Sequence, residues 1–136
     1  MPVEQNPFNV INKPVDGIII QYYIVNKNSN MSIDKICAQI AHGAQMHMFS
    51  YMQKKHKLSL PNGGKNFLQT EITEKWLSNM FTKIVLSGTE EDFEIIKKEL
   101  DVFSVISDLA EVVLVTWPVR SKPESLKKLE LLKIFE

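Results

Sequence analysis

The feature that most constrains the fold is the run IIIQYYIV at residues 18–25, which is apolar, β-branched or aromatic apart from one glutamine. A strand that faces water on one side alternates apolar and polar residues, whereas a continuous run is typical of a strand buried on both faces. Such a strand needs packed elements on both sides of its sheet. The run therefore predicts a sheet that is covered on both faces.

The same run bears on location in the cell. It falls far short of the roughly 20 apolar residues that a membrane-spanning helix needs. The chain does not open with a charged segment followed by an apolar stretch and a cleavage site. The single cysteine, Cys37, cannot form an intramolecular disulfide. We therefore expect a cytoplasmic protein with no membrane segment.

Length and composition indicate a single domain. A chain of 136 residues with 44% hydrophobic content can bury one substantial core and is too short for two ordinary domains. Residues 1–17 contain Pro2, Pro7 and Pro14 without periodicity, and they predict an N-terminal arm that is loose or lies on the surface. Residues 18–136 are then expected to form the domain.

The rest of the chain alternates between helical and strand patterns. Thr89 and the acids that follow it are typical of a helix start. The expected helices cover residues 32–54, 71–81, 89–100 and the start of 122–135, and the expected strands cover 18–25, 83–88, 102–106 and 112–117. This order predicts an α/β fold, a three-layer α/β/α sandwich around a mixed β-sheet of about four strands.

The first expected helix carries a polar line on one side. Spacings of three and four residues place Lys35, Gln39, His42 and Met46 along that line. The opposite arc is expected to pack on the sheet, and its members are Ile36, Cys37, Ile40, Ala41 and Ala44. From the spacing alone, the polar line is either a solvated face or a site.

Charge is balanced overall but unevenly placed. The formal net charge is zero, which argues against a wholly basic surface for tight non-specific nucleic-acid binding. Residues 54–83 nevertheless carry six lysines and two acids. Lys54, Lys55 and Lys57 are therefore either a phosphate-binding patch or a solvated helix end whose cations complement the helix dipole.

Other conspicuous side chains have simpler interpretations. His42, His47 and His56 are five and nine residues apart, a spacing that does not place two ligands on one helical face, so no metal site is predicted. The large apolar residues outside these patterns are expected to pack in the core, and they are Met46, Met48, Met52, Trp76 and Trp117.

The stretch YIVNKNSNMSIDKICAQIAHGA resembles the opening strand, loop and helix of the type 2 peptidyl-tRNA hydrolase family. The family pattern there is an apolar strand followed by Met-Gly-x-Gly-Lys-x-Ala-Ala-Gln-x-x-His-Ala. The residues that match this pattern are Met31, Lys35, Ala38, Gln39 and His42. The polar line on the first helix thus coincides with the family's motif.

The resemblance continues along the chain. KIVLSGTEEDFEIIKKEL is similar to a family strand and its acidic-start helix, and VFSVISD is similar to the strand that ends on the family's active-site Asp, here Asp108. VVLVTWP and KKLELLKIF resemble the last strand and the leucine-rich tail. After Asp108 the family continues with a Gly-x-Thr loop, whereas this chain passes through Leu-Ala-Glu directly into VVLV, so the family's threonines have no counterpart.

The resemblance implies a hydrolase that cleaves the ester between a peptide and the tRNA ribose, without metal or cofactor, as a homodimer. It implies that Lys35 holds a phosphate or the developing oxyanion, and that Asp108 orients Lys35 or accepts a proton from water. Gln39 would supply hydrogen bonds, and His42 would be a base, an orienting group or neither. Lys54, Lys55 and Lys57 would bind the tRNA backbone.

Two alternatives remain open at this point. The shortened connection after Asp108 also fits a non-catalytic homologue that binds tRNA, other RNA or a protein partner on the same scaffold. A hydrolase of a different small ester or amide is the other alternative.

Overall fold

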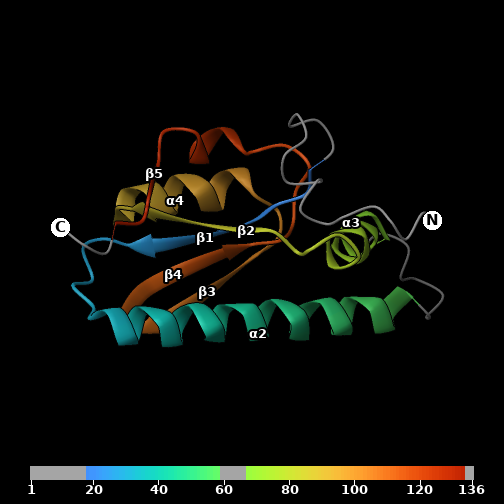
Figure 1. Ribbon diagram of the computed structural model, residues 1–136, viewed down its shortest axis with the longest axis horizontal. Helices are drawn as coiled ribbons and strands as arrows, with labels where there is room; N and C mark the ends of the chain where they lie inside the picture. The colour runs from blue at the N-terminus through green and yellow to red at the C-terminus, as the bar shows by residue number, and fades with distance from the viewer. Residues whose placement is uncertain (1–17, 59–66, 134–136) are drawn as a thin grey trace.

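The computed structural model describes residues 18–58 and 67–133, apart from the side chains of 57, 58, 67 and 68. Within these residues a five-stranded sheet lies between two helical layers (Figure 1). The predicted three-layer α/β/α sandwich is therefore confirmed. The predicted N-terminal arm at 1–17 lies outside the described residues.

The sheet is mixed, in the order β3-β4-β1-β2-β5. Its strands are β1 (Gln21–Asn26), β2 (Lys83–Gly88), β3 (Phe103–Asp108), β4 (Ala110–Thr116) and β5 (Glu130–Leu131). β1 pairs in parallel with β2 and antiparallel with β4, while β3–β4 and β2–β5 are antiparallel pairs. The expected count of about four strands misses β5, because two residues are too few to produce a periodic pattern.

Strand β1 is buried along its whole length, as the continuous apolar run predicted. Tyr22 and Ile24 belong to the core cluster on one face of the sheet, and Tyr23 and Val25 belong to the cluster on the other face. The glutamine within the run is satisfied: Gln21 Nε2 donates to the Thr116 carbonyl at 3.1 Å, and the Tyr23 hydroxyl donates to Gln21 Oε1 at 2.8 Å. Burial raises the pKa of Tyr23 to about 12, which keeps this donor protonated.

The helices cover opposite faces of the sheet (Figure 1). One layer contains α2 (Ile33–Leu58) with α3 (Phe67–Leu77) against it, and the other contains α4 (Glu90–Glu99) with the short helix η2 (Glu124–Leu126). α4 begins at the predicted cap, where Thr89 and Asp92 form a reciprocal capping box.

The lengths of α2 and α3 differ from the sequence expectations. α2 continues one turn beyond the expected end at residue 54. α3 begins before residue 71 and ends before residue 81, because the backbones of Met80 and Phe81 are left-handed, with φ of 85° and 41°.

The packed face of α2 is narrower than the sequence predicted. Ile36, Ile40 and Ala44 pack against the sheet as expected, but Cys37 and Ala41 are exposed. The buried line continues instead through Gly43, His47 and Tyr51. The residues of this line are three or four positions apart, so they form one face of the helix. Cys37 and Ala41 lie beside that face and not on it.

Two predicted core methionines are also exposed. Met46 is 44% exposed and Met52 is 63% exposed, so the prediction that they fill the core is wrong. The reason is tertiary: β3 ends the sheet, and the flank of α2 beyond β3 has no described strand beneath it. Trp76 and Trp117 are buried packing residues, as predicted.

Gly43 allows the middle of α2 to approach β4 closely. A Cβ placed on Gly43 would lie 2.5 Å from Val115 Cγ2 and 3.6 Å from Tyr23 Cε2. Val115 is 1% exposed and has little room to move. Glycine at this position therefore sets the spacing between helix and sheet.

We expect Gly43→Ala to lower the free energy of unfolding by about 1 kcal/mol, since overpacking costs about 1–3 kcal/mol and the gain in helix propensity returns about 1 kcal/mol. In a Val115→Ala background the clash is absent, and Gly43→Ala should then be neutral or stabilising. Urea unfolding of the four proteins in this cycle measures the coupling. The same cost in both backgrounds would show that the contact with Val115 is not the constraint.

His47 is a structural residue on the packed face of α2, one turn beyond Gly43. Its ring meets Trp76 edge-on with centroids 5.7 Å apart and Trp117 with centroids 4.9 Å apart. Burial, together with the positive charge of Lys83, lowers the pKa of His47 to about 4. The imidazole is therefore neutral in the folded protein at pH 7.

This burial predicts a loss of stability in acid. Between pH 6.5 and 4 the unfolded chain protonates His47 but the folded chain does not, so the free energy of unfolding falls by about 3 kcal/mol from this residue alone. We expect His47→Leu to lose that much less stability than wild type between pH 7 and pH 4 in urea titrations. Met48→Leu, one residue along the helix, leaves every titratable group in place and should follow wild type. Parallel profiles for wild type and His47→Leu would contradict the prediction.

Candidate functional site

The topology brings two distant segments to one end of the sheet. β1 and β3 are each adjacent and antiparallel to β4, so both run in the same direction and their carboxyl ends lie at the same end of the sheet. The chain that leaves β1 enters α2 in its first turn at Lys35, and β3 ends on Asp108. Ligands of open α/β sheets bind at such carboxyl ends.

Lys35 and Asp108 form an ion pair there. Lys35 Nζ lies 2.7 Å from Asp108 Oδ2, and the side chains are 51% and 37% exposed. The two residues that the family resemblance implied to act together are therefore in direct contact. Because the pair is reached by water and sits where a helix begins, a cation and a carboxylate are both presented to an approaching ligand.

A buried asparagine anchors the loop that leads from β1 to α2 and Lys35. Asn26 is 3% exposed, its Nδ2 donates to the Glu111 carbonyl at 2.9 Å, and its Oδ1 accepts from the Asn28 N–H at 2.9 Å. The bond to Glu111 ties the end of β1 to the start of β4, immediately beyond Asp108. Sequence reasoning missed Asn26; the available signal was an amide residue closing a strand that is buried on both faces.

The connection between β3 and β4 is very short. Asp108 pairs with Ala110, so Leu109 alone forms the turn, fully exposed and with a left-handed φ of 68°. A register shift between Ile106 and Ser107 precedes the turn. Asp108 thus sits at the tip of a tight hairpin, and its side chain is not covered by a loop from this connection.

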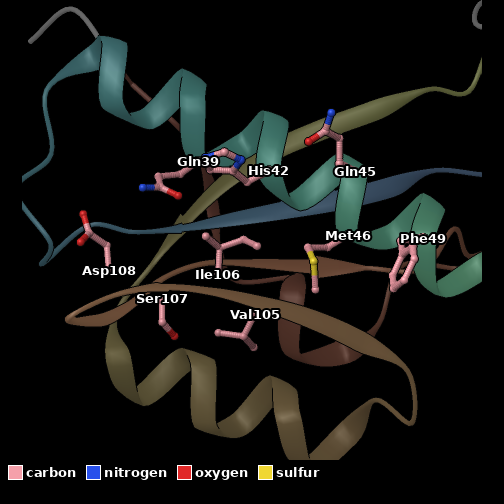
Figure 2. Close-up of a pocket in the computed structure, with 9 residues that line it drawn as sticks. All are labelled: Gln39, His42, Gln45, Met46, Phe49, Val105, Ile106, Ser107 and Asp108. Atoms are coloured by element: carbon pink, nitrogen blue, oxygen red, sulfur yellow. The ribbon is translucent and has the colours of Figure 1, made fainter.

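A cleft of about 610 Å³ extends from Asp108 along the groove between α2 and β3. Its lining residues, labelled in Figure 2, are Gln39, His42, Gln45, Met46, Phe49, Val105, Ile106, Ser107 and Asp108. The structure therefore gathers three of the four predicted catalytic residues in one cleft, with Lys35 joined to it through Asp108. Gln39 is half-buried and His42 is exposed.

The predicted tRNA-binding lysines are not part of this cleft. Lys55 pairs with Glu74 of α3, and Lys54 Nζ lies over the Trp117 ring, 5.9 Å from its centroid. Lys57 belongs to α2, but its side chain lies outside the described residues. The cleft extends along α2 as far as Phe49, so Lys54 lies about 8 Å beyond its end at 1.5 Å per residue.

The described residues hold neither a group of three or more His, Cys, Asp and Glu side chains placed to bind a metal ion, nor a helix long and apolar enough to cross a membrane.

The fold is a layered α/β sandwich, and the Lys35–Asp108 pair lies at the carboxyl ends of its strands, where ligands of open α/β folds bind. The family model described as Peptidyl-tRNA hydrolase PTH2 matches residues 19–111, and the chain belongs to this family. The resemblance found in the sequence is thereby confirmed. The match spans Lys35 through Asp108 and ends at Glu111. A comparison with individual curated proteins gives no significant match.

The exposure of the ion pair predicts that it contributes little to folding. Exposed pairs are worth up to about 1 kcal/mol, so we expect Lys35→Ala and Asp108→Asn each to change the free energy of unfolding by less than this. Asn26→Ala is the contrasting variant, because it removes a buried amide that holds the Glu111 carbonyl and the Asn28 N–H, and it should cost about 1–3 kcal/mol. Urea unfolding followed by circular dichroism measures all three. A loss above 2 kcal/mol for Lys35→Ala would give the pair a structural role.

Proposed function

We propose that this protein hydrolyses the ester bond of peptidyl-tRNA and releases a free peptide and tRNA. Membership in the peptidyl-tRNA hydrolase PTH2 family supports the reaction class. The observation that carries the proposal for this chain is the Lys35–Asp108 pair, 2.7 Å apart at the end of an open cleft.

The proposed chemistry follows from what an ester requires. Asp108 accepts a proton from a water molecule whose oxygen attacks the ester carbonyl carbon. The carbonyl oxygen becomes an oxyanion, which the ammonium of Lys35 stabilises. Collapse of this intermediate breaks the bond to the ribose oxygen, which takes up the proton that Asp108 accepted. A base and a cation 2.7 Å apart can act on one water and one carbonyl.

Gln39 and His42 have supporting roles in this proposal. Gln39 lies one turn beyond Lys35 and lines the same cleft, so its amide can hydrogen-bond the substrate. His42 lines the cleft and is exposed, so it can orient water or act as a second base.

The proposal extends to the tRNA body and to a second copy of this chain. Lys54, Lys55 and Lys57, which do not line the cleft, would bind phosphates of the tRNA body in a salt-dependent and sequence-independent manner. The family resemblance further supports a homodimer that acts in the cytoplasm.

One observation favours a second candidate function, a non-catalytic homologue that binds tRNA or a protein partner. The β3–β4 turn consists of Leu109 alone, so this connection contributes no hydroxyl beside Asp108. If catalysis needs a hydroxyl from that loop, the scaffold would bind without hydrolysis.

Hydrolysis of a defined N-acetyl-aminoacyl-tRNA, measured without added metal, tests the proposed function. We expect turnover by wild type and at least about a tenfold lower kcat/KM for Lys35→Ala and for Asp108→Asn, which is about 1.4 kcal/mol of transition-state stabilisation. Lys127→Ala is the matched control, because it removes an exposed ion pair of similar length, 2.6 Å to Glu124, away from the cleft.

The outcomes separate the candidates. Binding of the tRNA ester without turnover by the folded wild type would favour the non-catalytic homologue. Equal turnover by wild type and both site variants would place the chemistry elsewhere.

A further inference from the structure

The cleft beside Asp108 changes character along its length. Figure 2 shows Asp108 at one end and the Phe49 ring at the other, with the Met46 side chain next to Phe49. Met46 is 44% exposed and Phe49 is 58% exposed, and Met52, a turn further along α2, is 63% exposed. A run of large exposed apolar side chains that continues from a polar site is typical of a binding surface.

The other wall of the cleft is the edge of a sheet. β3 pairs with β4 on one side only among the described strands. In Figure 2 the Ile106 side chain points toward α2, whereas those of Val105 and Ser107 point away from it, so these two residues border the cleft along the edge of the strand. An unpaired edge can accept an extended chain through main-chain hydrogen bonds.

The charges around the cleft indicate which part of a tRNA ester fits where. The described residues that line the cleft include neither Lys nor Arg, so its walls have no cation to neutralise phosphates. At the opposite end the Lys35 ammonium contacts Asp108, whereas Lys54, the next cation along α2 beyond Phe49, holds its Nζ over the Trp117 ring, which does not line the cleft. The ribose and its phosphates therefore fit the Lys35 end, and the acyl group points along the cleft toward Phe49.

We propose that the apolar half of the cleft binds the peptide part of peptidyl-tRNA and gives the protein a preference for apolar residues at the ester. The side chain of the esterified residue packs on Met46 and Phe49, and the peptide backbone lies extended along the edge of β3. This inference rests on the proposed function, because the position of the ester at the Lys35–Asp108 pair sets the direction of the peptide.

A pair of matched substrates tests the preference. N-acetyl-phenylalanine and N-acetyl-glycine are each esterified to the same tRNA, and kcat/KM is measured for both. Contact of one large apolar side chain with a half-open surface predicts about a tenfold preference for phenylalanine. Phe49→Ser should lower kcat/KM for the phenylalanyl ester and bring the ratio close to one. Ile95→Ser removes another exposed apolar side chain, from α4 outside the cleft, and should keep the wild-type ratio.

Several results would overturn the inference. Equal kcat/KM for the two esters in wild type would mean that the side chain does not enter the apolar half. An equal slowing of both esters by Phe49→Ser would assign Phe49 to a part of the substrate that both share, such as the terminal adenine. Dissociation of a dimer by Phe49→Ser in sedimentation would make this surface an interface between two copies.

A binding measurement distinguishes this inference from the proposed function. In NMR titrations, N-acetyl-Leu-Val-Phe should shift the backbone amides of β3 and of Met46, and N-acetyl-Gly-Ser-Gly should not. These shifts without hydrolysis of either ester would support the peptide cleft while the proposed function fails. Hydrolysis of both esters at equal rates with no such shifts would overturn the peptide cleft alone.

Discussion

The burial of β1 on both faces is the constraint on which the rest of the structure depends. A strand whose six residues are all buried needs a layer above and a layer below, and α2 and α4 supply these layers. The crossover through α2 and α3 returns the chain parallel to β1, and β4 pairs on its other side. The candidate site follows from this arrangement. The chain that leaves β1 reaches Lys35 in the first turn of α2, and Asp108 ends β3, which runs in the same direction as β1.

Local sequence patterns correctly predicted those strands and helices whose limits are set by their own residues. The strand at 83–88 has the expected bounds, and the helix capped by Thr89 begins where its capping box requires. The closeness of Lys35 and Asp108, in contrast, came from a family motif. The residues lie 73 positions apart in the chain, and their spacing in the sequence carries no information about contact.

The sequence predictions failed where the tertiary environment decides. A helical period shows that α2 has an apolar side, but it does not show how far the sheet extends beneath that side. Among the described strands β3 is the last on this edge, so Met46 and Met52 are exposed, while His47, a polar residue, is buried against two tryptophans. The anchoring role of Asn26 was not predicted for a related reason, since its hydrogen-bond partner Glu111 is 85 residues away in the sequence.

The short turn at Leu109 links the geometry of the site to its energetics. A turn of one residue leaves Asp108 and Lys35 exposed, and the attraction between charges is weak where water surrounds them. An ester bound in the cleft changes that environment. Its ribose would cover the ion pair and its acyl group would fill the groove toward Phe49, so water would be displaced from both sides of the carbonyl. On the proposed function, the substrate itself therefore provides the low-dielectric surroundings in which a cation stabilises an oxyanion strongly.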